Sequence, residues 1–222
     1  MYNTKTLVIG AIPIGLLAIT HLKSLPLVYT IRAWLLLRSL IRKAKANQLR
    51  PDPLFSTVIQ EHRCYLDDID YNQHMNNSMY NKALDFSRIE IFYTIVPKIM
   101  MEPDHHIFAH NAGVVTLFKK EIPPFSKYTV ESRIYTWNDK WAMIQHRFVL
   151  DDGGVACYAL SKTVFKKLSG RTIPPRQVFQ LCGHDLQNSE VEERRSHNWK
   201  TAEHMLNLDK VMHDPYVWKS SL

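Results

Sequence analysis

A short, very polar run that leads directly into an amphipathic segment is the feature that most constrains this chain. Residues 67–77 read DDIDYNQHMNN, so carboxylates, carboxamides and one imidazole are crowded into eleven positions. Side chains of this kind are rarely found together in a hydrophobic core. We therefore expect the run to form a site rather than part of the interior.

The segment after this run has the spacing of an amphipathic helix. From residue 78 onward, apolar or small residues recur at three- and four-residue steps, and they are Tyr80, Ala83, Leu84, Ser87, Ile91 and Ile95. Asn76, Asn77 and Ser78 are all residue types that cap helix starts, and Pro97 predicts the end of the helix. The sequence therefore predicts one helix of about five turns.

The start of this helix would lie beside the polar run. The first backbone N–H groups of a helix have no intrahelical acceptor, and the helix dipole is positive at that end. Asp70, Asn72 and His74 directly precede it. This juxtaposition is suited to binding a carbonyl oxygen that becomes negatively charged.

The charge distribution argues against a nucleic-acid-binding protein. The net charge is +7, but eight of the 28 Lys and Arg residues lie in residues 1–50, where there is no Asp or Glu. The remaining chain is nearly neutral, so the basic excess belongs to the leader. Cys64, Cys157 and Cys182 form an odd, scattered set that predicts no disulfide framework and favours a reducing compartment.

Residues 1–50 are expected to associate with a membrane. Residues 6–22 are uncharged and apolar but short for a spanning helix, they include Pro13, and a cleaved signal peptide is the competing interpretation. Residues 25–41 are apolar, are interrupted by Arg32 and Arg38, and lead into a basic run, which is typical of a helix on an anionic membrane surface. The alternative is a helix packed on its own domain. The expected location is a membrane with the main domain on the cytoplasmic side, and the cytoplasm is the second choice.

The rest of the chain predicts an antiparallel sheet. Residues 55–66 are expected to form a first strand after the Pro51 and Pro53 boundary, and residues 97–112 a loop. That loop holds His105, His106 and His110, but three histidines without a spaced Cys or carboxylate do not predict a metal site. Further strands are expected over residues 113–121, 127–137, 141–150 and 155–166, with a hairpin turn at 151–154.

The fold class is therefore α+β, with one long helix across the concave face of the sheet. Residues 171–183 are expected to pack along an edge. Residues 189–208, with capping-box spacing from Ser189 to Glu192, read as a solvated helix. Three regions follow: a leader over 1–50, the main domain over 51–170 and a C-terminal extension over 171–222.

The polar run resembles a known signature. Residues 68–77 followed by Tyr80 resemble the motif of hotdog-fold acyl thioesterases. Asp70-x-Asn72-x-His74 with Asn76-Asn77 is similar to the motif of plant acyl-carrier-protein thioesterases, and residues 118–121 are similar to the segment that bears that family's catalytic glutamate, here Glu121. The overall layout is similar to single-domain thioesterase-like proteins, including enzymes of fungal secondary-metabolite clusters.

This resemblance implies a fold, a reaction and partners. It implies a hotdog fold, a sheet wrapped around one central helix, and a hydrolase acting on CoA or acyl-carrier-protein thioesters without a cofactor or a metal ion. The plant enzymes carry two hotdog repeats in one chain, whereas this sequence has one. The resemblance therefore implies a homodimer or a higher homo-oligomer.

Thioester hydrolysis needs an activated water or a carboxylate nucleophile, and donors for the oxyanion. The sequence contains no G-x-S-x-G nucleophile elbow. Asp70 is expected to be the base or nucleophile, His74 to orient it or share the proton transfer, and Asn72 to position the water or the carbonyl. Helix-start amides near Asn76 and Asn77 would hold the oxyanion, Glu121 would polarise the water, and Tyr80 would line the substrate tunnel.

Each of these residues also has a structural interpretation. Asp70 is of a type that fixes turns, His74 could be a hydrogen-bonded structural histidine, and Glu121 could be a strand-edge charge. Asn76 and Asn77 suit capping, and Tyr80 suits the core. The corresponding alternative function is a non-catalytic acyl-binding or scaffold protein at a membrane, and a hotdog dehydratase is a third, weaker possibility.

Overall fold

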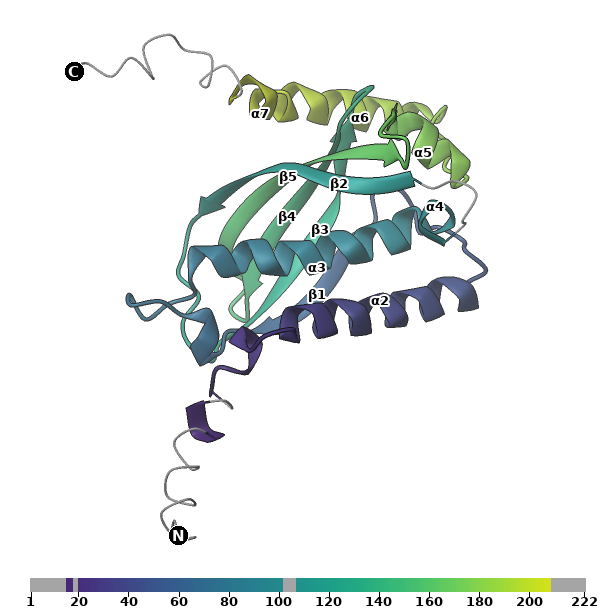
Figure 1. The fold of residues 1–222 in the computed structure, drawn as a ribbon. Helices are drawn as coiled ribbons and strands as arrows, with labels where there is room; N and C mark the ends of the chain where they lie inside the picture. The colour runs from purple at the N-terminus through teal and green to yellow at the C-terminus, as the bar shows by residue number, and fades with distance from the viewer. Residues whose placement is uncertain (1–14, 18–19, 102–106, 209–222) are drawn as a thin grey trace, which may run out of the picture.

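A curved antiparallel sheet wraps around one long helix, α3, Asn77–Ile95 (Figure 1). The computed structural model describes residues 15–17, 20–101 and 107–208. The strand order is β1-β3-β4-β5-β2, and the short β6 pairs with β5. The strands are β1 Val58–Arg63, β2 Ile107–Phe118, β3 Lys127–Trp137, β4 Ala142–Leu150, β5 Val155–Lys167 and β6 Thr172–Ile173. This is the predicted sheet-around-helix architecture.

Helix α3 forms where the periodicity predicts it. Asn76 is the N-cap, and its side-chain oxygen accepts the Ser78 N–H at 2.8 Å. The helix ends at Ile95, before Pro97. The six predicted positions are all buried: Tyr80, Ala83, Leu84, Ser87, Ile91 and Ile95. Arg88 and Phe92 are buried as well, and both contact strand β5.

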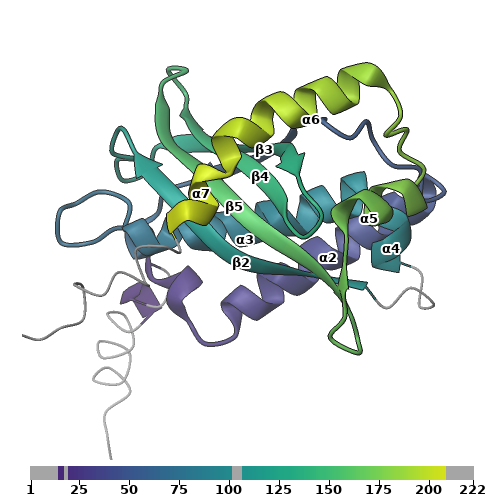
Figure 2. The same ribbon diagram turned by 90° about the horizontal axis from the view of Figure 1, so that it is seen from above.

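Helix α2, Val28–Ala46, lies along the opposite side of α3 from the sheet (Figures 1 and 2). The Tyr29 and Phe86 rings are 5.3 Å apart, and the Arg32 guanidinium lies 4.9 Å from the Phe86 ring. Leu40 and Ala44 of α2 are buried. The helix expected in this part of the leader is therefore present, and one of its faces packs on the domain, which puts α3 between two layers.

The membrane-spanning candidate over residues 6–22 lies largely outside the described residues. Across residues 15–17, 20–101 and 107–208, no helix combines the length and the apolar character needed to cross a bilayer.

The β3–β4–β5 meander follows the predicted boundaries closely, because alternation and turn residues specify it locally. The Asp151-to-Gly154 turn joins β4 to β5, and Gly153 supplies a φ of +79° that other residues rarely adopt. Strand β1 is shorter than predicted at both ends, since it pairs with β3 only from Val58 to Arg63.

The prediction of a loop over residues 97–112 was wrong in two places. Helix α4, Pro97–Met101, begins at the proline, which suits a first helical position because it needs no N–H there. Strand β2 begins at Ile107, well before the predicted residue 113, because it pairs with β5 from Lys167 onward. It also ends at Phe118, so Glu121 lies in the β2–β3 connection and not in a strand.

The C-terminal region packs on the sheet. Helix α5, Pro175–Leu181, follows β6, and helices α6, Ser189–Ala202, and α7, His204–Asn207, complete the described chain. The predicted capping box at Ser189 was wrong, since Asn188 is the N-cap and accepts the Glu190 N–H at 2.9 Å. Helix α6 is not wholly solvated either, because Thr136 of β3 donates to the Arg195 carbonyl at 2.7 Å.

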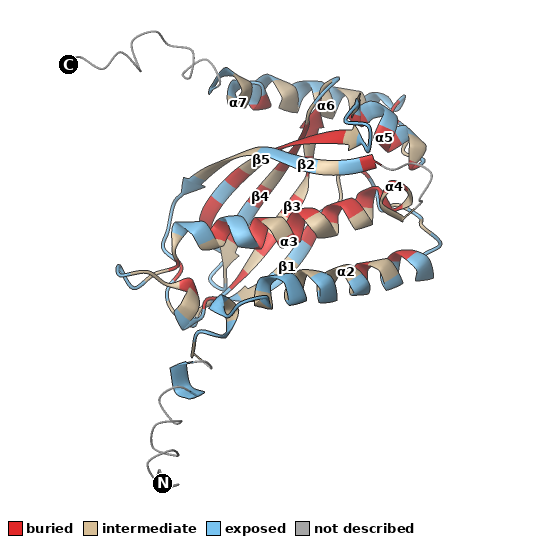
Figure 3. Cartoon of the chain, in the orientation of Figure 1, coloured by how far each residue is buried: buried red, intermediate tan, exposed pale blue. Residues whose placement is uncertain are grey.

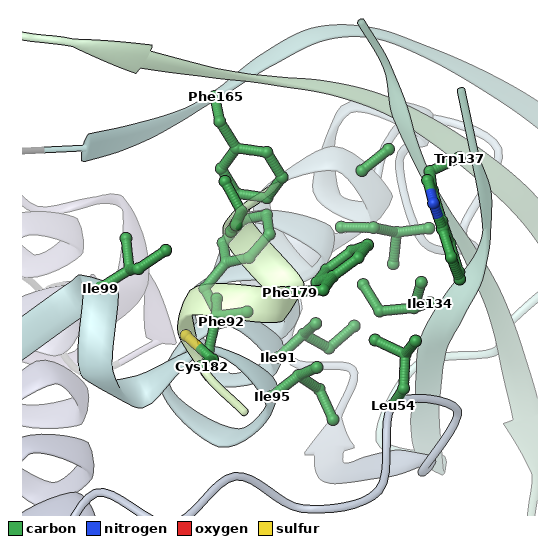
Figure 4. Close-up of a cluster of buried hydrophobic side chains, with 14 of the residues drawn as sticks. Leu54, Ile91, Phe92, Ile95, Ile99, Ile134, Trp137, Phe165, Phe179 and Cys182 are labelled. Atoms are coloured by element: carbon green, nitrogen blue, oxygen red, sulfur yellow. The ribbon is translucent and has the colours of Figure 1, made fainter. Parts of the chain in front are cut away.

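The interior consists of two apolar clusters along α3, and buried residues follow the inner faces of the sheet and of α3 (Figure 3). One cluster surrounds the C-terminal half of α3, where Phe179 of α5 packs between Trp137 and Phe165 (Figure 4). The other surrounds the N-terminal half and includes Met75, Tyr80 and Phe148. The polar run therefore rests on a packed base.

Candidate active site

The loop over residues 67–77, which we call the site loop, is folded tightly by its own hydrogen bonds. The Asp70 carboxylate accepts the Asn72 N–H at 2.9 Å, and the Asp70 carbonyl accepts the Gln73 N–H at 3.0 Å. The Asp70 N–H donates to the His74 carbonyl at 3.1 Å, which closes the turn. Asp70 thus occupies the turn position that its residue type favours, and its side chain is half-buried.

Two backbone bonds fasten the site loop to the rest of the domain. The Met75 N–H donates to the Ile122 carbonyl at 2.9 Å, and the Asn76 N–H donates to the Asp68 carbonyl at 2.8 Å. Met75 is almost fully buried beneath the loop. These anchors hold the loop between the start of α3 and the β2–β3 connection.

The anchor at Ile122 brings Glu121 to His74. The His74 Nε2 lies 3.8 Å from the Glu121 Oε1, and the His74 Nδ1 is 3.3 Å from the Met75 carbonyl. The His74 side chain is 24% exposed and that of Glu121 is 75% exposed. Two of the predicted residues, 47 positions apart in sequence, therefore meet at the rim of the loop.

Asn76 accepts two of the first N–H groups of α3. The Asn76 side chain takes the Ser78 N–H, and the Asn76 carbonyl accepts the Met79 N–H at 2.9 Å. Among the described residues, the Asn77 N–H has no hydrogen-bond acceptor. Asn72 and Asn77 are both exposed.

Comparison with known proteins decides the family. The sequence profile of the thioesterase-like superfamily matches residues 64–192, which include the site loop, Glu121 and the whole sheet from β2 onward. The chain belongs to the thioesterase-like superfamily.

Two relatives and one solved structure agree with this assignment. The chain is 38% identical over 134 residues to the probable thioesterase YBR096W of Saccharomyces cerevisiae, a match that covers 60% of this chain and 57% of the yeast protein. It is 30% identical over 216 residues to thioesterase lcsJ of Purpureocillium lilacinum, with 76% of this chain and 69% of that protein covered. The probable thioesterase YbaW of Escherichia coli superposes with a TM-score of 0.52 at 17% identity, over 56% of this chain and 94% of that one, and so shares the hotdog fold.

Tyr80 of this thioesterase-like protein lies beneath the site loop. Its ring packs 5.0 Å from Phe118 in an edge-on arrangement and 4.8 Å from Phe148, and it is almost fully buried. Burial raises the pKa of its hydroxyl well above the usual range. The ring therefore belongs to the core, and supports the loop from below.

The histidines that raised the question of a metal site are not gathered into one in the described structure. His110 is exposed on β2, and His105 and His106 lie outside the described residues. Within the described ranges, no group of three or more His, Cys, Asp and Glu side chains could hold a metal ion. All three cysteines are buried.

A buried polar chain beneath α3 was not found from the sequence. His146 of β4 is fully buried, with its Nδ1 2.6 Å from the Ser132 hydroxyl and its Nε2 2.9 Å from the Ser161 hydroxyl. Ser87 donates to Ser132 at 2.6 Å, and Arg88 donates to Ser161 at 3.1 Å. Burial, with a smaller contribution from the Arg88 charge, lowers the pKa of His146 to about 3, so the imidazole is neutral.

Arg88 also borders a groove of about 890 Å³ between α2, α3, α4 and β2. Most of its wall is apolar and includes Phe92, Met100 and Ile107, whereas Asp85 and Arg88 supply charge. No residue of the site loop lines it. The groove begins at Asp85, which is about 12 Å along the helix from Asn77 at 1.5 Å per residue.

Proposed function

We propose that this protein hydrolyses acyl thioesters of CoA or of an acyl carrier protein, and that Asp70 activates the attacking water. The observation that carries this proposal is the placement of the Asp70 turn at the start of α3, where its neighbour His74 meets Glu121. Family membership supports the reaction class.

The chemistry assigns a role to each group. The Asp70 carboxylate takes a proton from a water molecule, whose oxygen attacks the thioester carbonyl carbon. The carbonyl oxygen becomes negative and is held by the Asn77 N–H and the positive end of α3. Collapse of this intermediate breaks the C–S bond and releases the acid and a thiolate. A thiolate is a good leaving group and needs little help from an acid. Asp70 then gives its proton to the thiolate or to solvent, which restores the carboxylate.

His74 and Glu121 complete the arrangement. A carboxylate next to an imidazole fixes the orientation of the ring. At 3.8 Å, Glu121 is close enough to orient His74 when a bound substrate excludes water. Asn72 is exposed above the same turn, and we assign it to position the water or the acyl carbonyl. Direct attack by Asp70 on the carbonyl carbon, with a covalent anhydride intermediate, is the variant of this mechanism.

We assign the acyl chain to the groove between α2 and α3. Its apolar walls suit a hydrocarbon chain, and its volume is in the range of small-molecule sites. The distance of about 12 Å between the start of α3 and the groove means that only the distal part of a medium or long acyl chain would reach it. Short acyl groups would gain nothing from it.

A second copy of the chain is expected to pair at β2. This strand is at the edge of the sheet, and exposed edges with free N–H and C=O groups are templates for pairing with another strand. Phe108, Leu117 and Phe118 of β2 are exposed apolar residues that such pairing would cover. The expected homodimer is tested by the mass of the protein in solution, by light scattering, for the wild type and for a Leu117→Lys variant.

The outer face of α2 is proposed to lie on an anionic membrane. Leu27, Ile31, Trp34 and Leu35 form an exposed apolar surface, and the exposed Arg38, Arg42 and Lys45 follow it along the helix. Ile31→Asp should abolish co-sedimentation with vesicles containing phosphatidylserine. The matched control is Leu168→Asp, which places the same charge on an exposed leucine of the β5–β6 turn. Equal binding of the two variants would refute the assignment.

The hydrolase proposal is tested by thiol release from short, medium, long and aromatic thioesters of CoA and carrier protein. We expect turnover by the wild type and a loss of at least about 100-fold in kcat for Asp70→Ala. Asp185→Ala is the matched control, because Asp185 is an exposed carboxylate that accepts the Gln187 N–H at 2.9 Å in the same local geometry. No turnover across the whole panel would refute the proposal.

A non-catalytic acyl-binding protein is the second candidate. It is favoured by the hydrogen bond from the Asn72 N–H to the Asp70 carboxylate, which gives Asp70 a purely structural task. In that case Asp70→Ala would leave acyl affinity intact, and no variant would show turnover. Turnover that depends on Asp70 excludes this candidate.

A further inference from the structure

The segment just before α2 contacts the base of the site loop. The short 3-10 helix η1, Leu22–Ser24, lies against a second one, η2, Leu66–Asp68, which begins the loop. The backbone N–H groups of Lys23 and Ser24 both donate to one carboxylate oxygen of Asp67, at 2.5 and 3.2 Å. A part of the leader, more than 40 residues away in sequence, is thus joined to the loop that carries Asp70.

The side chain of Lys23 makes a second, more buried contact. Its ammonium pairs with the Asp68 carboxylate, donates to the Arg63 carbonyl at 3.2 Å and lies 4.6 Å from the centre of the Tyr65 ring. The Asp68 side chain is 2% exposed and that of Lys23 is 19% exposed. Removing one partner of a buried ion pair leaves an uncompensated charge, so the contact between Lys23 and Asp68 is costly to break.

Asp68 connects Lys23 to the start of α3 through further hydrogen bonds. Its carboxylate also accepts the Tyr65 N–H at 2.8 Å, and its carbonyl accepts the N–H of Asn76, the N-cap of α3, at 2.8 Å. The connection from Lys23 through Asp68 to Asn76 encloses both ends of the site loop, and Asp70 lies two residues beyond Asp68.

The attachment of α2 does not require Lys23. Helix α2 is already held on α3 by Leu40 and Ala44, which are buried, and by the contacts of Tyr29 and Arg32 with Phe86. The contacts of η1 lie instead at the base of the site loop, on Asp67 and Asp68 and on the residues just before them. Their position therefore suits fixing the geometry of the site loop.

We infer that residues 22–24 act as a clamp on the site loop, and that Lys23 is a positioning residue for Asp70. This inference rests on the proposed thioester hydrolysis. It makes the leader part of the active-site scaffold, independently of any contact between the leader and a membrane.

Lys23→Met tests the clamp, because methionine retains much of the apolar stem and removes the charge. The matched control is Arg195→Met. Arg195 also pairs with a carboxylate, Glu192, and donates to a backbone carbonyl, that of Trp137 at 3.0 Å, and its side chain is 23% exposed. It does so at the α6–β3 contact and not at the site loop.

With a water-soluble acyl-CoA substrate, we expect Lys23→Met to lower kcat by about 10- to 100-fold with little change in KM, because displaced catalytic groups lose this much. Arg195→Met should retain the kcat of the wild type while losing a comparable amount of thermal stability. Lys23→Arg should restore most of the rate. A kcat for Lys23→Met within twofold of the wild type, or an equal loss in Arg195→Met, would overturn the inference.

Two further measurements cover the remaining outcomes. If Lys23→Met does not fold, Asp67→Ala, which removes the acceptor of the two η1 amides, should lower kcat severalfold, and an unchanged rate would overturn the clamp. If the wild type shows no turnover, the proposed hydrolysis fails, and hydrogen exchange decides on the clamp. Faster exchange over residues 68–77 in Lys23→Met than in Arg195→Met supports it, and equal exchange overturns it.

Discussion

The two ends of α3 differ in the residues that surround the helix terminus. At the C-terminal end, Ile91, Phe92 and Ile95 pack into an apolar cluster that Phe179 closes (Figure 4). At the N-terminal end, the helix begins in a polar, partly exposed loop that is held by backbone hydrogen bonds and turn geometry. If the N-terminal end carries the proposed chemistry, substitutions at the two ends should have separable effects, on stability at the C-terminal end and on activity at the N-terminal end.

The largest effect on stability is expected at the apolar end. Phe179 is fully buried, with its ring 5.0 Å from that of Trp137. Phe179→Ala should lower the free energy of unfolding by about 3–5 kcal/mol, because it removes a large buried side chain and leaves a cavity. Urea denaturation measures this, with the exposed Leu168→Ala as control. A loss below about 1 kcal/mol, or a changed kcat of the folded fraction at low temperature, would show that the two ends of α3 do not have separate roles.

The next effect is a pH dependence of stability caused by His146, which lies beneath the middle of α3. The pKa of His146 is about 3 in the folded protein and near 6.5 when unfolded, so only the unfolded state binds this proton between those values. The stability is therefore fully present above pH 6.5 and falls by about 1.4 kcal/mol for each pH unit below it. Urea denaturation from pH 7 to pH 4 measures the free energy of unfolding, which should change less steeply with pH in His146→Gln than in the wild type. Identical slopes would contradict the assignment.

A smaller effect separates capping from chemistry at the start of α3. Asn76→Ala should lower stability by about 1 kcal/mol, because the Ser78 N–H loses its acceptor. Asn76→Asp keeps an acceptor and adds a charge that suits the helix dipole, so stability should be retained. The same negative charge opposes a developing oxyanion, and kcat should fall. Thermal unfolding and kcat are measured on both variants, and an undiminished kcat in Asn76→Asp would move the oxyanion away from this helix.

The smallest effect is expected at Glu121. Its side chain is largely exposed and 3.8 Å from His74, so Glu121→Gln should change the free energy of unfolding by less than about 0.5 kcal/mol. The expected loss in kcat is at most about tenfold, since this residue acts through His74. A loss as large as that of Asp70→Ala would instead place Glu121 on the reacting atoms.

The sequence predicts the features of this fold that local patterns encode. The buried face of α3 and the β3–β4–β5 meander follow from periodicity and turn residues. The first half of β2 could not be predicted, because it depends on pairing with β5 more than 50 residues later. Local propensity at Asn111 and Gly113 even argues against a strand, and pairing overrides it.

The residues proposed for the site come from the sequence, whereas the contacts that hold them could not be predicted. The polar run identified Asp70, Asn72 and His74, whose roles remain predictions. The buried hydrogen-bonded side chains around His146 could not be predicted from the sequence, because they meet only when the strand register sets Ser132 opposite His146. The contact between Lys23 and Asp68 joins residues 45 positions apart, and no spacing rule connects them.

The Asp70→Asn variant separates the charge of Asp70 from its role in the turn. The amide oxygen can still accept the Asn72 N–H, so the turn is kept and only the charge is lost. We predict a kcat lower by about 100- to 10,000-fold on the best acyl thioester, with an unchanged thermal midpoint. A rate within twofold of the wild type would contradict the claim that the Asp70 carboxylate activates the attacking water.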